Sequence, residues 1–197
     1  MTIKFERRSE MGYFDQPDNV QDYIKMVDGY DGKDLIQNLD IYLEPSSSLL
    51  EIGMGPGNDL DILNKKYNVT GSDSSDVFLN LYQEKNPDAD LINLDALSLK
   101  TGRKFNCIYS NKVLHHLHRE DMQKSLVRQL DLLEDNGIAL HTFWEGEGEE
   151  IHHGLLFVYY SLEEIKKMIP DGYKELQLGL YKEDENDDSI LLIIQKI

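Results

Sequence analysis

Three glycines alternate with other residues in the stretch from Leu49 to Asp59, which reads LLEIGMGPGND. A hydrophobic run precedes them and a helix-like segment follows, so the stretch predicts a strand, a tight turn and a helix. Glycine is needed where the backbone takes a positive φ, or where a Cβ would hold a ligand away. Because open α/β sheets bind ligands at the carboxyl ends of their strands, we expect a ligand here rather than a plain glycine turn.

The spacing of the glycines argues against a dinucleotide. The dinucleotide fingerprint is G-x-G-x-x-G, but Asn58 stands where its last glycine should be, and the third glycine comes one residue early, at Gly57. Asp59 and Asp61 would also repel a pyrophosphate placed at the start of the following helix. A phosphate-free or cationic cofactor fits better, which leaves a nicotinamide-dependent oxidoreductase as a minor alternative.

Two further carboxylates stand at the ends of predicted strands. Asp73 closes the strand predicted at 68–72, and Asp95 closes the one predicted at 90–94. One carboxylate accepts hydrogen bonds from two neighbouring hydroxyls, and ionised acceptors form the stronger bonds, so Asp73 suits a ribose. The alternatives are a helix cap for Asp73 and a turn residue for Asp95.

The pattern E-x-G-x-G-x-G at Glu51 to Gly57, followed by Asp73 and Asp95, resembles the class I S-adenosylmethionine-dependent methyltransferases. The phrase Asp95-Ala96 and the stretch YSNKVLHHL at 109–117 are also similar to motifs of that family. The resemblance spans roughly residues 31–197. It implies a Rossmann-like fold and S-adenosyl-L-methionine as the cofactor.

The resemblance also implies a role for each matching residue. Glu51 would lie near the methionine amino group, and Asn111 near the methionine end. Asp73 would accept both ribose hydroxyls, while Asp95 would take the adenine amino group beside the backbone amide of Ala96. The complete set of cofactor-binding residues implied in this way is Glu51, Gly53, Gly55, Gly57, Asp73, Ser74, Asp95, Ala96 and Asn111.

Three histidines, His115, His116 and His118, follow the strand predicted at 105–110 and therefore stand at the same sheet edge as the glycines. Methyl transfer requires a base where the nucleophile holds a proton, and histidine suits that task near neutral pH. We predict His116 as the catalytic residue, with His115 beside it. The alternative is that these histidines cap and pack the next helix. No HExxH or CxxC spacing occurs, so no metal site is expected.

The strand predicted at 137–144 ends in HTFW, and the acidic, glycine-containing segment EGEGEE follows at 145–150. We predict His141 and Trp144 as substrate-binding residues, because an indole ring offers a flat wall to an apolar or cationic molecule. The following segment would serve as a mobile lid over the substrate. The alternative is a solvated loop with Trp144 packed beneath it, and solvated loop histidines are also the simplest reading of His152 and His153.

The elements that must position these residues alternate between strands and helices. Helices are predicted from Asn58 to about Tyr67, from Ser75, and over Glu120–Glu134, and a capping box at Ser161 begins another that ends near Ile169. Two strand-like runs, at 173–181 and 189–194, close the chain. This order predicts an α/β, doubly wound, mainly parallel seven-stranded sheet with a C-terminal antiparallel hairpin.

Composition sets outer limits on function. The 197 residues include 20 Lys and Arg against 37 Asp and Glu, which gives a net charge of −17. That charge opposes binding to nucleic acid or to an anionic membrane. The single cysteine, the absence of an apolar N-terminal stretch and the lack of a long apolar run predict a cytoplasmic protein. The length predicts a single methyltransferase domain over 1–197, in which a helical segment at 1–45 caps the cofactor site.

These observations, with the resemblance, predict methyl transfer from S-adenosylmethionine to the O, N or C atom of a small-molecule acceptor. The alternative is a catalytically silent, methyltransferase-like subunit whose acidic surface binds a basic partner protein. The sequence predicts neither the acceptor nor the oligomeric state.

Overall fold

The computed structural model describes residues 12–184 and 187–197, so the first part of the predicted N-terminal cap lies outside it. The helices are η1 (Tyr13–Asp15), α1 (Pro17–Met26), α2 (Lys33–Ile36), η2 (Gln37–Ile41), α3 (Asn58–Leu63), α4 (Asp76–Lys85), η3 (Leu114–His116), α5 (Arg119–Leu132) and α6 (Leu162–Met168). The strands are β1 (Ser48–Ile52), β2 (Asn68–Asp73), β3 (Leu91–Asn93), β4 (Phe105–Ser110), β5 (Leu133–Trp144), β6 (Glu149–His152), β7 (Leu155–Val158), β8 (Tyr173–Tyr181) and β9 (Ser189–Lys196).

Seven of these strands form one sheet in the order β3-β2-β1-β4-β5-β9-β8. The pairs among β1 to β5 are parallel, whereas β9 lies antiparallel to both β5 and β8. The predicted fold class is therefore confirmed. Because the parallel strands all point the same way, the turn after β1 and the turn after β4 meet at one edge of the sheet.

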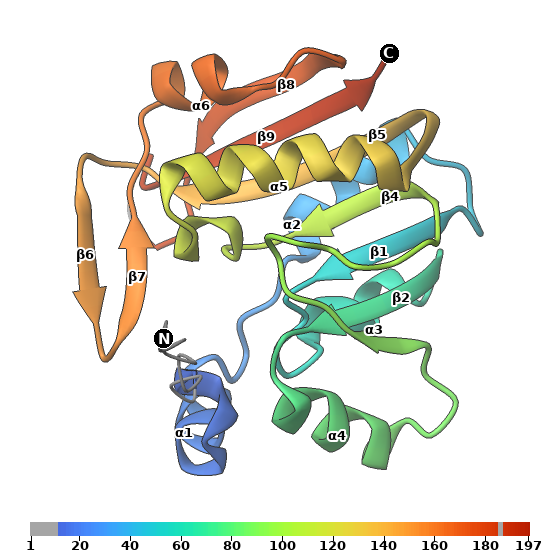
Figure 1. Ribbon diagram of the computed structural model, residues 1–197. Helices are drawn as coiled ribbons and strands as arrows, with labels where there is room; N and C mark the ends of the chain where they lie inside the picture. Colours follow the sequence, from blue (N-terminus) through green and yellow to red (C-terminus); the bar gives the residue numbers. More distant parts are fainter. Residues whose placement is uncertain (1–11, 185–186) are drawn as a thin grey trace, which may run out of the picture.

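Successive side chains of the central strands pack alternately into two hydrophobic cores, one on each face of the sheet. Leu50, Ile108 and Ala139 pack with α5 and α6 on one face. Their neighbours Leu49 and Cys107 pack with α2, α3 and α4 on the other. Figure 1 shows α5 in front of the sheet and α2 and α3 behind it. Strands buried on both faces are the reason for the short, continuous apolar runs in the sequence.

The predicted element boundaries hold well in the sheet and less well in the helices. β1, β4 and β8 begin and end at the predicted residues. β5 begins at Leu133 instead of Gly137, because α5 passes directly into a strand that pairs with Phe105. The helix predicted from Asn58 to about Tyr67 ends at Leu63.

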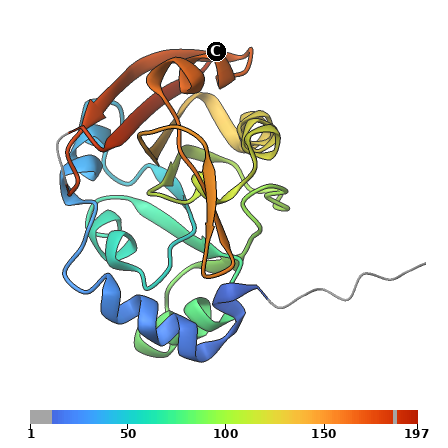
Figure 2. The ribbon, with the colours of Figure 1, turned by 90° about the vertical axis from the view of Figure 1, so that its left-hand side faces the viewer.

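The sequence analysis missed the β6–β7 hairpin, which forms a second, two-stranded sheet. All four residues of β6 are exposed, so no alternation of polar and apolar residues marks the strand. In Figure 1 the hairpin stands on the same side of the molecule as α1, and Figure 2 views that side directly. No helix within the described ranges is long and apolar enough to cross a membrane.

Candidate active site

A cavity of about 570 Å³ opens at the carboxyl edge of the parallel strands. Its walls come from six parts of the chain: the η1–α1 segment with the residues after it, the end of β1 with the glycine turn and the start of α3, the turn after β4, the end of β5, the β6–β7 hairpin, and the connection between β8 and β9. Cavities of this size are typical of small-molecule sites. Segments that are far apart in the sequence therefore meet at one site.

The glycine turn has a backbone that other residues adopt only with strain. Gly53, Gly55 and Gly57 have φ angles of 68°, 50° and 91°. A Cβ on Gly57 would lie 2.3 Å from the Tyr82 ring, so this glycine allows close packing of the helix against α4. A Cβ on Gly55 would meet nothing nearer than Tyr23 at 3.8 Å, and Gly55 lines the cavity. Its backbone is therefore open to close approach by a ligand.

Two buried carboxylates, Glu51 and Asp59, line the floor of the cavity. Asp59 accepts hydrogen bonds from the Gly32 amide, from the Tyr109 hydroxyl at 2.7 Å and from the Asn111 side-chain amide at 3.1 Å. Glu51, by contrast, is 3% exposed, and its Oε2 has no hydrogen-bond partner among the described residues. Burial, with the nearby charges of Asp59 and other acids, raises the pKa of Glu51 well above its usual range.

Asp73 ends β2, and its carboxylate fixes the glycine turn. Its Oδ2 accepts from the Gly55 amide and its Oδ1 from the Ser75 amide, both at 2.9 Å. Burial raises the pKa of Asp73, and these backbone hydrogen bonds act in the opposite direction. The carboxylate is 8% exposed and does not line the cavity.

An aromatic cluster of Phe14, Tyr23 and Phe78 lies close to Asp73. The Phe14 ring centroid lies 5.1 Å from that of Tyr23 and 5.4 Å from that of Phe78. The Ser75 hydroxyl donates to the Phe14 carbonyl at 2.5 Å, and the charge of Asp73 contributes to a raised pKa of Tyr23. The η1–α1 segment is thereby held against the end of β2.

The residues predicted at the adenine end are also outside the cavity. Ser74 is exposed, and its carbonyl accepts from the Asn93 side chain. Asp95 is exposed and caps a turn by accepting from the Ser98 amide at 2.8 Å. The carbonyl of Ala96 accepts from the Ser125 hydroxyl at 2.6 Å.

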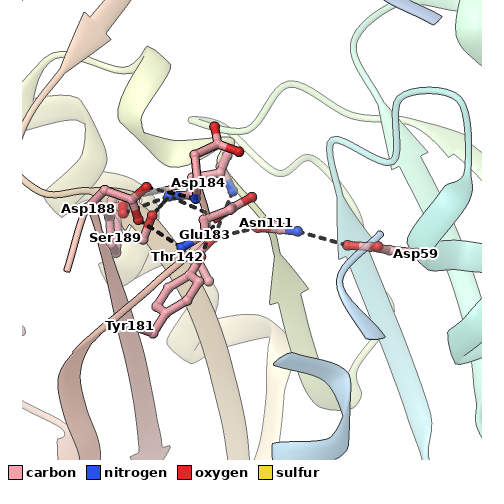
Figure 3. A network of polar contacts seen from close by, with 10 residues as sticks. Asp59, Asn111, Thr142, Tyr181, Glu183, Asp184, Asp188 and Ser189 are labelled. Carbon is pink, nitrogen blue, oxygen red and sulfur yellow. Dashed lines mark hydrogen bonds and ion pairs between the residues drawn. The ribbon is translucent and has the colours of Figure 1, made fainter. Parts of the chain in front are cut away.

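A chain of hydrogen bonds connects the cavity floor to the end of β5 (Figure 3). Asn111 donates to Asp59 and accepts from the Thr142 hydroxyl at 2.6 Å. Thr142 in turn accepts from the Lys112 amide at 2.9 Å. Lys112 has a φ of 54°, an uncommon conformation for a residue with a side chain, and this network holds the strained turn in place.

The Lys112 ammonium is itself enclosed by the C-terminal part of the sheet. It donates to the Ser189 hydroxyl at 2.6 Å and the Phe143 carbonyl at 3.0 Å, and it pairs with Glu183 at 3.2 Å. It also lies 3.5 Å from the centroid of the Trp144 ring. Burial lowers the pKa of Lys112 to about 8. Trp144 lines the cavity as predicted, but this face of its ring already holds a cation of the chain.

His115 and His116 lie side by side on another wall, with ring centroids 4.0 Å apart and Phe157 of the hairpin against both. His116 Nδ1 lies 2.7 Å from the Leu156 carbonyl. A carbonyl only accepts, so Nδ1 carries the proton and Nε2 of the neutral ring is an acceptor. Burial lowers the pKa of His116.

His115 is only 1% exposed, and neither of its ring nitrogens has a hydrogen-bond partner in the described part of the chain. Burial, with the nearby His116 and Lys112, lowers its pKa well below the usual range. A neutral imidazole without partners is costly inside a protein. No group of three or more His, Cys, Asp or Glu residues in the described ranges is arranged to hold a metal ion.

The structure does not bring His141 to the cavity. Its side chain is fully buried, with Nδ1 2.7 Å from the Ser110 hydroxyl and Nε2 2.9 Å from the Gln129 side chain. Burial lowers its pKa to about 3. In β5 it points toward α5, where it connects the strand to the helix.

Sequence reasoning missed several residues of the site. Asp59 appeared only as an acid in the first turn of α3, although it is the acceptor that joins three segments. Lys112 was given no role within the motif-like stretch at 109–117, and Phe157 stood in no motif. Lys112 directly follows Asn111 in the fourth-strand stretch, which was the one available signal, whereas Phe157 lies in the hairpin that was not predicted.

Comparison with known proteins shows what this geometry is similar to. Residues 49–137, which contain the glycine turn, Asp73, Asp95 and the two histidines, match the family described as "Methyltransferase domain". Over this part the chain is similar to methyltransferases, and its fold is that of S-adenosylmethionine-dependent methyltransferases. Over 125 residues it is 28% identical to the trans-aconitate 2-methyltransferase of Agrobacterium fabrum, a match that covers 61% of this chain. The same match spans 47%, or about half, of that relative's own length.

Solved structures of methyltransferases share the fold. An S-adenosylmethionine-dependent methyltransferase from Clostridium acetobutylicum superimposes with a TM-score of 0.74 at 14% identity, covering 89% of this chain and 96% of that one. The N-methyltransferase NodS from Bradyrhizobium japonicum, in complex with S-adenosylhomocysteine, gives 0.68 at 15% identity over 87% and 90% of the two chains.

The cavity takes in only part of the residues that the resemblance implied for the cofactor. Those that line it are Glu51, Gly53, Gly55 and Asn111. Those that lie outside it are Gly57, Asp73, Ser74, Asp95 and Ala96. The residues for the methionine end thus share one cavity with His115, His116 and Trp144.

Proposed function

We propose that the protein transfers a methyl group from S-adenosylmethionine to a small-molecule acceptor bound in this cavity. The observation that carries the proposal is the buried carboxylate oxygen of Glu51, which has no hydrogen-bond partner in the described part of the chain and stands beside the glycine turn. An unpartnered buried acceptor costs free energy unless a ligand supplies a donor. The amino group of the cofactor is such a donor.

The cofactor fits the floor of the cavity in charge as well as in hydrogen bonding. The carboxyl groups of Glu51 and Asp59 lie close enough to interact electrostatically. This pair of acids favours binding of the positive ammonium and sulfonium groups. Glu51 and Asn111 would hold the methionine end, and the backbone at Gly53 and Gly55 would lie against it. When bound, S-adenosylmethionine supplies an electrophilic methyl group.

The nucleoside end requires a movement of the chain. Asp73 keeps unused acceptor capacity, since its two oxygens have about four lone-pair sites and the backbone amides of Gly55, Ser74 and Ser75 use at most three of them. The cluster of Phe14, Tyr23 and Phe78 lies against it, so the proposal requires Phe14 and Tyr23 to give way when the ribose binds. In this proposal Gly57, Ser74, Asp95 and Ala96 complete the nucleoside site, and the helical segment within 1–45 is a cap over the cofactor.

His116 is the proposed general base. Its Nδ1–H is held by the Leu156 carbonyl, which presents Nε2 as the acceptor, and burial lowers its pKa so that the ring is neutral at pH 7. A neutral imidazole in the cavity wall is ready to take a proton from the nucleophile. His115 packs against it, and Trp144 and Phe157 form apolar walls that exclude water.

The size of the cavity and the names of relatives support a small acceptor. Trans-aconitate is named as a small molecule acted on by one relative. The cavity is also enclosed by the hairpin and the β8–β9 connection, which suits a compact molecule better than a polymer.

Calorimetric titration with S-adenosylhomocysteine tests the proposal. We expect saturable binding to the unmodified protein and a loss of about 1.5 to 3 kcal/mol in Asp73→Asn if its charge-assisted bonds to the ribose are removed. Asp88→Asn is the matched control, because Asp88 is exposed and does not line the cavity. The absence of binding would contradict the proposal and favour the alternative of a catalytically silent subunit that binds a basic partner protein. Equal affinities in the two variants would show that Asp73 does not bind the ribose.

A further inference from the structure

We propose that the methyl acceptor presents an amine to the cavity, and that acceptors presenting a carboxylate are excluded. This inference rests on the proposed function, because it concerns the second molecule bound at the same site. It differs from what the name of the trans-aconitate 2-methyltransferase would suggest for an acceptor.

The charges on the cavity wall provide the first argument. Asp22, Asp31, Glu183 and Asp184 all line the cavity above its floor, from the α1 region on one side and the β8–β9 connection on the other. Lys112 is the only lysine or arginine among the described residues of the wall. Asp22 is paired with Lys25, and Glu183 with Lys112, so the repulsion of an anion comes mainly from Asp31 on one side and Asp184 on the other. A negatively charged molecule therefore meets like charge from both sides, whereas a cation is attracted.

Lys112 is not available to bind a carboxylate. Its ammonium already contacts the Ser189 hydroxyl, the Phe143 carbonyl and the carboxylate of Glu183. The Trp144 ring covers it as well. An anionic acceptor would have to break these contacts, at a cost that one new ion pair does not recover.

The histidine pair provides an independent second argument. Both ring nitrogens of His115 lack hydrogen-bond partners within residues 12–184 and 187–197, although the side chain is almost completely buried in the cavity wall. Such a group indicates a place where a ligand completes the hydrogen bonding. Next to it, His116 presents Nε2 as an acceptor, because its Nδ1–H is held by the Leu156 carbonyl. An amine supplies N–H donors to His116 Nε2 and to the acceptor nitrogen of His115, whereas an ionised carboxylate supplies no donor and could only accept from the one N–H of His115.

The reaction that follows from an amine is balanced without a further reactant. The ammonium proton passes to His116 Nε2, and the freed nitrogen lone pair forms a bond to the methyl carbon. The bond between that carbon and sulfur breaks with its electron pair on sulfur, so the sulfonium becomes a neutral thioether. The proton on His116 is then released to solvent.

The test compares matched amines and carboxylates on protein saturated with S-adenosylhomocysteine. The pairs are phenethylamine with 3-phenylpropanoate, hexylamine with hexanoate, and glucosamine with glucuronate. Binding is followed by calorimetry and by the fluorescence of Trp144, the single tryptophan, which lies in the cavity wall. We expect at least one amine to bind about tenfold more tightly than its partner. Tighter or equal binding of every carboxylate, or no binding of any member, would overturn the inference.

The outcome separates this inference from the proposed function. Binding of S-adenosylhomocysteine with a preference for carboxylates leaves the methyltransferase proposal intact and removes the amine. Failure to bind S-adenosylhomocysteine removes the methyltransferase proposal itself. Transfer of an isotopically labelled methyl group to the preferred amine would give a second readout.

A pair of variants tests the acidic wall directly. Asp184→Asn removes one exposed carboxylate of the wall, and Asp187→Asn makes the same change nearby at a residue that does not line the cavity. We expect Asp184→Asn to reduce the ratio of amine to carboxylate affinity about threefold, with no change in Asp187→Asn. An unchanged ratio in Asp184→Asn, or an equal reduction in both, counts against the inference.

Discussion

Two buried histidines, His141 and His115, differ in how completely the protein satisfies their hydrogen bonding. Both are almost completely inaccessible to solvent. His141 has a partner at each ring nitrogen, Ser110 and Gln129, whereas neither nitrogen of His115 has one among the described residues. The described residues supply partners for both ring nitrogens of His141 and for neither nitrogen of His115. This difference indicates that a ligand supplies the hydrogen bonds of His115.

The two carboxylates of the cavity floor differ in the same way. Asp59 accepts from three protein donors and connects segments of the fold, while Glu51 keeps an oxygen without a partner. Burial alone therefore does not identify a functional group. The distinguishing property is whether the protein provides all of the hydrogen bonds that the buried group requires.

The largest expected effect concerns His141. We expect His141→Leu to reduce the free energy of unfolding by about 2 to 4 kcal/mol, because Ser110 and Gln129 are left buried without their partner. Urea-induced unfolding measures the change. Adding Ser110→Ala and Gln129→Leu should recover part of the loss, since no polar group is then stranded. A loss of unfolding free energy smaller than that of an average surface substitution would contradict the structural role assigned to His141.

Glu51→Gln should weaken binding without destabilising the fold. We expect the affinity for S-adenosylhomocysteine to fall by about 1.5 to 3 kcal/mol, because a charge-assisted hydrogen bond is lost. The pKa of Glu51 is raised, so the folded state is penalised as the pH rises above 4.5 and the residue ionises in the unfolded chain. The variant should therefore become more stable relative to the unmodified protein between acidic and neutral pH.

Calorimetry and urea titrations at several pH values measure both quantities for Glu51→Gln. Glu84→Gln is the matched control, because Glu84 is exposed and lies outside the cavity. A large loss of stability at neutral pH, with unchanged affinity for S-adenosylhomocysteine, would show that Glu51 stabilises the fold and does not bind the cofactor.

Lys112 extends the comparison to a buried cation. Its ammonium has hydrogen-bond partners in the protein, yet burial still has the largest effect on its pKa. That pKa is lowered from 10.5 to about 8, so from pH 8 to pH 10.5 the unfolded chain holds more protons at this residue than the folded one. Stability from this group must therefore rise with pH through that window. We expect the unfolding free energy of the unmodified protein, minus that of Lys112→Met, to increase by about 1 to 2 kcal/mol across it. A flat difference in urea titrations would contradict this.

The smallest expected effect is that of His115→Leu. Replacing an imidazole that has no partners with an apolar side chain removes a desolvation cost, so we expect the free energy of unfolding to stay the same or to rise by about 1 kcal/mol. Thermal and urea unfolding measure it beside His141→Leu. The same variant should lose binding of the acceptor. Destabilisation as large as that of His141→Leu would mean that the two histidines do not differ as argued.

The central strands of the sheet were predictable because they are buried on both faces, and the local sequence shows that directly. The exact agreement of β1 and β4 with the predicted ranges reflects apolar runs bounded by polar or glycine residues. The β6–β7 hairpin was not predictable in this way. Its first strand is exposed on both sides, so hydrogen bonds to β7, and not a burial pattern, define it.

The site was predictable where backbone conformation imposes a residue type. The glycine turn was identified from sequence because its positive φ angles require glycine. The roles of His115 and His141 could not be told apart, because each follows from contacts across the sheet: Gln129 comes from α5, and Phe157 from the hairpin. Sequence position alone gave both the same expectation of facing a ligand.

The β6–β7 hairpin forms its own small sheet and does not share the register of the seven-stranded one. Its base is fastened by Arg119, which donates to the Gly148 and Tyr159 carbonyls. Changes in its length or side chains therefore leave the main pairing undisturbed. Exchanging this hairpin between homologues would therefore change one wall of the cavity while the glycine turn on the main sheet is kept as it is.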